Sequence, residues 1–270
     1  MSDSTELPEI VLFGDSLTQW GFDENTRGFG WVLENKYEGK AIVLNEGVAG
    51  YTSTWLKPRF REIIERATES TASPTLLITI FLGANDACLP PAGAHVPLPK
   101  FEDNIRDYVE TILDEEGLEN TKIVLITPPP INIPDPNPDE IDIGPAASAA
   151  EEYDAKKSRG YRTYMSKKQY GDKIMEIAAF YEETGRVAGL NYWKALIDAG
   201  LADQNRSGEE DEYHEDRLPG CGLKWAKAFK KGYFTDGLHL DGLAYDVLSK
   251  ELLDLVLTKW PELAPEKVEL

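Results

Sequence analysis

The sequence predicts an α/β protein whose parallel sheet is covered by helices on both faces. Short apolar runs that end in glycine or other turn residues alternate with longer stretches of helical periodicity, which is the pattern typical of such a sheet. The 270 residues are 41% hydrophobic and 10% aromatic, enough to bury a sizeable core. We therefore expect one domain over residues 1–270, with loop insertions near 128–160 and 203–232.

The predicted strands and helices alternate along the chain. Strands are expected over residues 9–13, 41–45, 76–82, 122–127 and 187–192. Helices are expected over residues 30–40, 53–70, 101–116, 167–184 and 243–259. Each strand is thus followed by a helix, as the crossover connections of parallel strands require.

Two segments interrupt this alternation after the fourth strand. Residues 128–144 contain six prolines, so this segment cannot be a helix and should form an ordered or semi-extended loop. The loop could cover the site as a lid or brace a subunit contact, and both roles stay open. Residues 203–216 are dominated by Asp and Glu, which favours a solvated acidic loop.

The charge balance argues against several classes of partner. With 28 basic and 48 acidic residues, the formal net charge is −20 at pH 7, and a field of that sign repels nucleic acid and anionic lipid. No run approaches the roughly 20 apolar residues that a membrane-spanning helix needs. We expect a soluble protein that acts on a small neutral or cationic molecule, binds neither nucleic acid nor membrane, and is either a monomer or a homo-oligomer.

Cysteine usage and the start of the chain indicate a cytoplasmic location. The only cysteines are Cys88 and Cys221, which is unlike a disulfide scaffold and suits a reducing compartment. Cys88 should be a small buried hydrophobe, whereas Cys221 lies between glycines and should be more exposed. A strand-like run follows directly after the polar residues 1–6, so no signal peptide is expected.

The first predicted strand runs into Gly14-Asp15-Ser16-Leu17-Thr18. Ser16 is thereby placed just past the carboxyl end of a buried strand, where open α/β sheets bind their ligands. A serine hydroxyl becomes an effective nucleophile when a base lies within hydrogen-bond reach and a third group holds that base. The alternatives are a helix cap and a phosphate-binding turn, although neither a Gly-rich repeat nor a Lys or Arg follows in the turn.

Three histidines, His95, His214 and His239, are available as the base. The first lies in a Pro-rich loop and the second in the acidic run, where a solvated surface role is the simpler interpretation. His239 comes just before the C-terminal helix, and Asp236 can fold back across a Gly-containing turn to accept its Nδ1 proton. Asp241 is a competing orienting group at a poorer spacing, and a plain capping turn is the alternative for the whole segment.

An acyl-transfer site also needs donors for the developing oxyanion. Gly50 lies in the loop after the second strand and can bring its backbone N–H close to a substrate because it has no Cβ. Asn85, in Gly83-Ala84-Asn85-Asp86 after the third strand, offers a neutral side-chain amide. Each signal alone is weak because such turns are ordinary, but Ser16, Gly50 and Asn85 all follow the ends of successive strands.

These blocks, in this order, resemble the four signature blocks of the SGNH or GDSL hydrolases. The blocks are Gly14-Asp15-Ser16-Leu17, Gly50, Gly83-Ala84-Asn85-Asp86 and Asp236-Gly237-Leu238-His239. The resemblance covers about residues 9–258, apart from the two loops after residue 127. More narrowly, the chain is similar to the isoamyl acetate-hydrolysing esterase branch of this family at Gly50-Tyr51-Thr52-Ser53, Phe81-Leu82-Gly83-Ala84-Asn85-Asp86-Ala87-Cys88 and Val96-Pro97-Leu98.

The resemblance implies a three-layer, flavodoxin-like five-stranded parallel sheet of order 2-1-3-4-5, with neither metal nor cofactor. Carried over position by position, it implies Ser16 as the nucleophile, His239 as the base and Asp236 as the group that orients this base. The implied oxyanion hole consists of the Ser16 N–H, the Gly50 N–H and the Asn85 side chain. The insertions after residue 127 depart from the family pattern and leave the acyl and alcohol pockets undefined.

We therefore expect a serine carboxylester hydrolase that acts on small or short-chain esters through an acyl-enzyme. A carbohydrate O-deacetylase, a lysophospholipase or a thioesterase would use the same residues, and the non-enzyme alternative is a catalytically silent binding module of the same fold. Trp20, Phe22, Leu89 and Leu238 flank the signature blocks and are candidates for an apolar acyl site. Core packing is the alternative for each of these four side chains.

Overall fold

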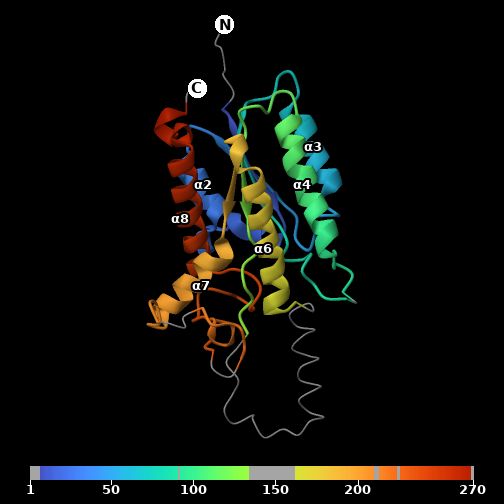
Figure 1. Cartoon of the computed structure of the whole chain (residues 1–270). Coiled ribbons are helices and arrows are strands. Elements are labelled where there is room, and N and C mark those ends of the chain that lie inside the picture. The colour runs from blue at the N-terminus through green and yellow to red at the C-terminus, as the bar shows by residue number, and fades with distance from the viewer. Residues whose placement is uncertain (1–6, 91, 134–161, 210–212, 224–225, 269–270) are drawn as a thin grey trace, which may run out of the picture.

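The computed structural model describes residues 7–90, 92–133, 162–209, 213–223 and 226–268, and within them five parallel strands form one sheet (Figure 1). The strands are β1 (Glu9–Gly14), β2 (Ile42–Gly47), β3 (Thr75–Phe81), β4 (Lys122–Ile126) and β5 (Val187–Leu190). Their spatial order is β2-β1-β3-β4-β5, and every neighbouring pair is parallel. The predicted sheet and its strand order are confirmed, and each strand begins and ends within two residues of its predicted bounds.

Helices cover both faces of this sheet. Helices α3 (Lys57–Ala67), α4 (Leu98–Asp114) and α6 (Tyr164–Phe180) lie on one face, and α2 (Phe29–Lys36), α7 (Tyr192–Asp203) and α8 (Gly242–Lys259) on the other (Figure 1). The short helix α1 (Ser16–Gln19) follows β1. Among the described helices, none combines the length and apolar character needed to cross a bilayer. Short 3₁₀ turns occupy Trp20–Phe22, Glu24–Thr26, Glu182–Thr184, Glu215–Arg217, Pro261–Leu263 and Pro265–Lys267.

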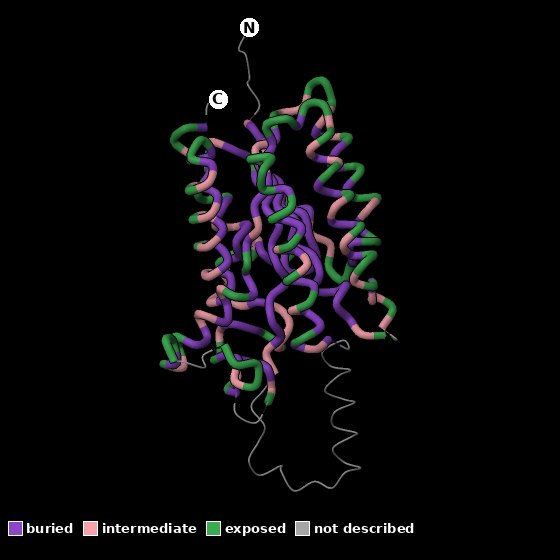
Figure 2. The backbone as a smooth tube through the Cα atoms, viewed as in Figure 1, coloured by how far each residue is buried: buried purple, intermediate pink, exposed green. Residues whose placement is uncertain are grey.

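Both faces of the sheet are buried, which explains why the strand sequences are apolar without alternation. Along β1, Ile10 and Leu12 belong to the core beneath α2 and α8, whereas Val11 and Phe13 belong to the core beneath α3 and α4. Buried residues concentrate along the strands and on the inner sides of the helices, and exposed residues lie on the outer helix surfaces (Figure 2). The sheet is therefore the middle layer of three.

The structure corrects the prediction for the region after β4. The strand predicted over 187–192 ends at Leu190, and Asn191 caps the unpredicted helix α7 by accepting a hydrogen bond from the Lys194 N–H at 3.0 Å. Helix α7 ends at Asp203, so the predicted acidic loop starts inside a helix, and residues 210–212 of that loop lie outside the described residues. In the Pro-rich segment, residues 128–133 are non-helical and mostly buried, and residues 134–144 lie outside the described residues.

Both cysteines are free and buried. Cys88 is 2% exposed, as predicted, and Cys221 is slightly more exposed at 8%, but it is still buried. Cys221 belongs to the core on the α2, α7 and α8 face of the sheet. Burial raises the pKa of both thiols.

Helix α1 lies close against the ends of β1 and β2, and two glycines permit this approach. A Cβ on Gly14 would lie 2.2 Å from Thr18 Oγ1, and a Cβ on Gly47 would lie 2.2 Å from the Gln19 backbone nitrogen. A side chain at either position would push the helix away from the sheet. The two glycines therefore fix where Ser16 emerges at the carboxyl edge of the sheet.

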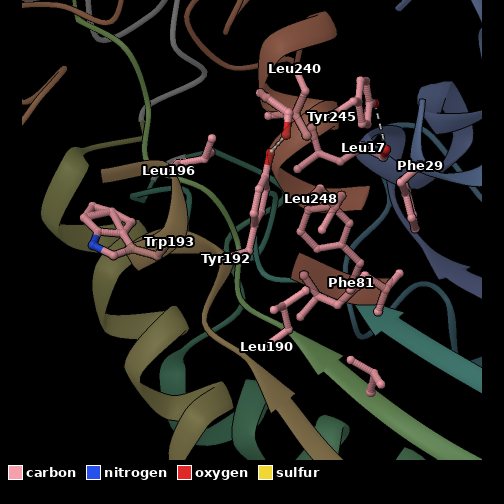
Figure 3. Packing of buried hydrophobic residues seen from close by; sticks show 14 of the residues in the cluster. Leu17, Phe29, Phe81, Leu190, Tyr192, Trp193, Leu196, Leu240, Tyr245 and Leu248 are labelled. Carbon is pink, nitrogen blue, oxygen red and sulfur yellow. Dashed lines mark hydrogen bonds between the residues drawn. The ribbon is translucent and has the colours of Figure 1, made fainter. Parts of the chain in front are cut away.

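Tyr245 of α8 fastens α1 to the core. Its hydroxyl donates to the Leu17 carbonyl at 2.9 Å, and its ring stacks on that of Phe29 (Figure 3). Tyr37 makes a comparable buried bond to the Leu263 carbonyl at 2.7 Å, near the amino ends of the strands. The same type of bond thus occurs both beside Ser16 and at the opposite edge of the sheet.

We expect Tyr245→Phe to lower the free energy of unfolding by about 1–2 kcal/mol, because the variant removes the donor to a buried carbonyl. Tyr37→Phe is the matched variant at the other edge and should lower the free energy of unfolding by a similar amount. Urea unfolding followed by circular dichroism measures both values. Wild-type stability of Tyr245→Phe would show that this bond does not hold α1 in place.

Candidate active site

Ser16 is the first residue of α1, and its neighbour Asp15 provides the cap. The Asp15 Oδ1 atom accepts a hydrogen bond from the Leu17 N–H at 2.9 Å, so the alternative in which Ser16 itself caps the helix is wrong. Ser16 is only 6% exposed. Because the N–H groups of the first helical turn have no partner within the helix, the Ser16 N–H is available as a donor at the same edge as the Ser16 hydroxyl.

Asp236 and His239 form a close pair across a tight turn. Asp236 Oδ2 lies 2.6 Å from His239 Nδ1, and Asp236 Oδ1 accepts the N–H groups of Leu238 at 2.9 Å and His239 at 2.8 Å. Burial acts to raise the pKa of the Asp236 carboxyl, but these hydrogen bonds outweigh it and hold the pKa below its usual value. An ionised Asp236 therefore keeps a proton on His239 Nδ1 and leaves Nε2 free to accept another.

Trp20 connects this pair to the turn that carries Ser16. Its ring lies 4.3 Å from that of His239, centroid to centroid, at an angle of 50°. Trp20 comes one helical turn after Ser16 and is 46% exposed. The imidazole is thereby packed against the segment that carries Ser16.

The other proposed pocket residues pack differently. The Phe22 ring covers Gly30, where an added Cβ would lie 2.3 Å from it, and both Phe22 and Leu238 pack half-buried against the core under α2 and α8. Leu89 is half-buried. Of the four candidates, Trp20 packs its ring against a residue of the predicted site, His239.

Gln19 links helix α1, which begins at Ser16, to the loop after β2. Its side-chain oxygen accepts the Ala49 N–H at 2.6 Å, and its carbonyl accepts from Asn45 Nδ2 at 3.0 Å. Gly50 follows with φ of +80°, in the left-handed region that favours glycine, and an added Cβ would meet nothing within 4 Å. Gly50 is therefore required for its backbone conformation rather than for space.

Asn85 connects the loop after β3 to the same place. Its Nδ2 donates to the carbonyl of Tyr51, the residue after Gly50, at 2.8 Å, and the side chain is almost fully buried. The contacts through Gln19, Asn85 and Trp20 thus join all four predicted blocks at one edge of the sheet.

A buried network around Asp86 supports this arrangement. Asp86 accepts the Ser53 N–H at 3.0 Å and the Ser53 hydroxyl at 2.5 Å. Asn104 of α4 donates to Ser53 Oγ at 3.0 Å and to Thr54 Oγ1 at 2.9 Å, and the Tyr108 hydroxyl donates to the Ser53 carbonyl. Burial raises the pKa of Asp86 to about 6 although the Ser53 hydrogen bonds act to lower it. The network holds the loop after β2 against α4.

Two further buried ionisable side chains, Asp15 and Lys167, lie beneath the site. Burial raises the pKa of Asp15 against the effect of the Leu17 N–H, and burial together with the Arg162 charge lowers the pKa of Lys167. Among the described residues, neither Asp15 Oδ2 nor the Lys167 ammonium has a hydrogen-bond partner. The sequence predicts Lys167 only as the first residue of a helix. The signal for its burial is its position on the inner face of α6.

The remaining candidates have other roles. Asp241 is the N-cap of α8 and accepts the Gly242 N–H at 2.7 Å, so Asp236 is the acid that contacts His239. His95 is half-buried with its Nδ1 2.5 Å from the Cys88 carbonyl, which contradicts the solvated surface role predicted for it. His214 is exposed. Within the described ranges, no three His, Cys, Asp or Glu side chains form a group that could hold a metal ion.

We expect Asp86→Asn to remove a pH dependence from the stability. The pKa of Asp86 is about 6 in the folded protein, against a usual value of 3.8, so the folded state binds the carboxyl proton more tightly than the unfolded state does. The stability that this proton contributes is therefore lost as pH rises from about 4 to about 6. Relative to wild type, the variant should gain up to about 3 kcal/mol of unfolding free energy between pH 4 and pH 7.

Urea unfolding at several pH values measures this gain. Asp103→Asn, at an exposed position of α4, removes the same formal charge and is the control for net charge. A constant difference between Asp86→Asn and wild type across pH 4–7 would contradict the raised pKa.

Comparisons with known proteins agree with the predicted family. The model of the GDSL-like lipase/acylhydrolase family matches residues 10–252. The chain is 31% identical to the isoamyl acetate-hydrolyzing esterase of Saccharomyces cerevisiae, over 97% of this chain and 91% of the yeast protein. It is 29% identical to a GDSL esterase/lipase of Arabidopsis thaliana, over 90% of this chain and 84% of the plant protein.

Solved structures share the fold at low sequence identity. A lipase/acylhydrolase from Enterococcus faecalis has a TM-score of 0.56 at 18% identity and covers 94% of this chain and 97% of its own. A catalytic mutant of an acetylxylan esterase from Geobacillus stearothermophilus has a TM-score of 0.55 at 18% identity and covers 93% and 95%. With its family model, relatives and fold in agreement, the chain belongs to the GDSL-like lipase/acylhydrolase family and is a carboxylic ester hydrolase.

Proposed function

We propose that this hydrolase acts on short-chain esters through an acyl-enzyme, with Ser16 as nucleophile, His239 as base and Asp236 as the group that orients His239. The observation that carries the proposal is the Asp236 carboxylate, which lies 2.6 Å from His239 Nδ1 while two backbone N–H groups hold its other oxygen. A carboxylate fixed in this way sets the imidazole tautomer and stabilises the imidazolium formed during catalysis.

The first half-reaction begins when Ser16 Oγ attacks the ester carbonyl carbon and gives its proton to His239 Nε2. The negative charge on the substrate oxygen is held by the Ser16 N–H, the Gly50 N–H and the Asn85 amide. When the tetrahedral intermediate collapses, the C–O bond to the alcohol breaks, and His239 returns the proton to the departing alcohol oxygen.

The second half-reaction replaces the alcohol with water. His239 takes a proton from water, whose oxygen attacks the acyl carbon, and the Ser16–acyl bond breaks as the proton returns to Ser16 Oγ. Asp236 stays ionised throughout, in keeping with its lowered pKa. His239 accepts and returns the proton in both half-reactions, so the mechanism calls on no metal or cofactor.

A small ester substrate is supported by the surroundings and by the relatives. Ser16 and Asn85 are each only 6% exposed, so a reacting carbonyl must fit a confined space. The yeast relative carries the name of an isoamyl acetate-hydrolyzing esterase. The net charge of −20 favours a neutral or cationic substrate over an anionic one.

Removal of acetyl groups from a carbohydrate is a second candidate, favoured by a groove of about 470 Å³ beside the Gly50 loop. Tyr51 and Trp55 line this groove, are 43% and 48% exposed, and pack edge to face with centroids 6.1 Å apart. Glu46 and Arg59 also line the groove and pair with each other at 2.7 Å, with the Arg59 side chain 46% exposed. Rings next to hydrogen-bonding side chains suit a sugar, which is apolar on one face and carries hydroxyls at its edge.

We expect Asp236→Asn to lower kcat by about 10³- to 10⁴-fold, because the amide no longer enforces the required tautomer of His239. Asp241→Asn is the matched control: it changes the neighbouring acid into another good N-cap residue and should leave kcat unchanged.

Ser16→Ala should abolish turnover and organophosphonate labelling without loss of stability. Wild-type ester hydrolysis by Ser16→Ala would refute the proposed mechanism.

We expect hydrolysis of p-nitrophenyl esters to be fastest from acetate to butyrate and to fall toward laurate. Isoamyl acetate and an acetylated xylo-oligosaccharide, compared by kcat/KM, separate the two candidate substrate classes. If the carbohydrate is the substrate, Trp55→Ala should lower kcat/KM on the oligosaccharide and leave p-nitrophenyl acetate unaffected. A maximum at laurate would contradict the short-chain proposal.

A further inference from the structure

Arg162 contacts the third signature block from a distant part of the sequence. It is 9% exposed and lies just before α6. Its Nε donates to the Ala84 carbonyl at 2.6 Å, and its Nη2 donates to Asn85 Oδ1. Two nitrogens of one planar guanidinium group thus bind two successive residues that lie more than seventy positions earlier in the chain, a geometry that a lysine cannot reproduce.

The bond to Oδ1 determines which way the Asn85 amide faces. The two ends of an asparagine amide are nearly equal in shape but opposite in function, because one end accepts and the other donates hydrogen bonds. Arg162 holds the accepting end, and Nδ2 at the other end donates one hydrogen to the Tyr51 carbonyl at 2.8 Å. The direction of the second Nδ2 hydrogen is then fixed by the planarity of the amide.

We propose that Arg162 is a positioning residue of the oxyanion hole, which holds the Asn85 amide with an N–H toward the substrate oxygen and strengthens that N–H as a donor. The inference rests on the proposed function, in which Asn85 stabilises the oxyanion. A charged donor on the amide oxygen draws electron density from the nitrogen, and linked hydrogen bonds strengthen one another. Burial of Arg162 and Asn85 makes this polarisation larger than it would be in water.

The proposed role has a kinetic signature. Negative charge on the substrate oxygen is greatest in the transition state, so a weakened or misdirected donor raises the barrier more than it weakens substrate binding. Loss of Arg162 should therefore lower kcat and leave KM almost unchanged. If Arg162 only stabilised the fold, its loss would instead lower the free energy of unfolding, and any loss of kcat would not depend on Asn85.

A double-mutant cycle tests this directly. Arg162→Gln, Asn85→Ala and the double variant are compared with wild type on p-nitrophenyl acetate. Since removal of a whole oxyanion donor costs about 10²- to 10³-fold in kcat, we expect Arg162→Gln to cost about 10- to 100-fold, with little change in KM. In the Asn85→Ala background, Arg162→Gln should lower kcat no further, because the group through which it acts is absent.

Two further variants separate positioning from folding. Arg162→Lys keeps the charge without the planar fork, so it should recover part of the lost kcat, and it carries the test if Arg162→Gln does not fold. Arg186→Gln is the matched control, because Arg186 also donates to buried backbone, at the amino edge of the sheet. It should lower stability and leave kcat unchanged. Arg186 donates to the carbonyls of Ile112, Leu113, Leu118 and Thr121.

The possible outcomes distinguish this inference from the proposed function. Equal losses of kcat from Arg162→Gln in both backgrounds, or wild-type kcat for Arg162→Gln, would overturn the positioning role while leaving the mechanism intact. Wild-type kcat for Asn85→Ala would remove the oxyanion role of Asn85, and the role of Arg162 with it. Wild-type activity of Ser16→Ala would refute the proposed function itself.

Discussion

The place of β1 between β2 and β3 is the constraint on which the candidate site depends. All strands of a parallel sheet end at the same edge, so the segments that follow these three neighbouring strands emerge side by side. Gln19 can then reach the loop after β2, and Asn85 can reach the same loop from the other side. Each additional strand between them would widen the gap by about 4.8 Å, and the two bonds could then form only if the loops were longer.

The same edge contains buried polar groups that hydrophobic packing alone would not favour. Asp86 is fully buried but accepts several hydrogen bonds, whereas Asp15 Oδ2 and the Lys167 ammonium have no hydrogen-bond partner among the described residues. Burying such groups is costly unless they are paired. At the amino edge, Arg186 instead satisfies backbone carbonyls directly. Buried polar atoms without a partner also occur away from this edge, as at Thr75 Oγ1 and Ser249 Oγ. Asp15 and Lys167, however, are ionisable side chains, and both lie beside the proposed chemistry.

Most of the fold could be predicted because each strand and most helices carry a local pattern, whereas the errors involve choices that local pattern does not settle. Helix α7 was missed because Tyr192 and Trp193 prolong the apolar run of β5, although Leu196, Ile197 and Leu201 continue at helical spacing.

At the candidate site, Asp15 and Ser16 are both good caps, and only the backbone geometry selects Asp15. Arg162 belongs to no short motif, and its partner Asn85 is remote in sequence. The contact between them could therefore not be predicted from the sequence and is found only in the folded chain. The roles of Ser16, Asp236 and His239 stay predictions.

The two buried thiols make opening of the molecule measurable at two separate places. Cys88 lies beside the third signature block, with its carbonyl bound to His95, whereas Cys221 lies in the core on the α7 face. A thiol that is buried and has a raised pKa reacts with an alkylating reagent only after its surroundings open. Equal alkylation rates mean that whole-molecule unfolding exposes both cysteines. Faster alkylation of Cys88 means that the carboxyl edge of the sheet opens by itself, and the two native cysteines report this without any introduced probe.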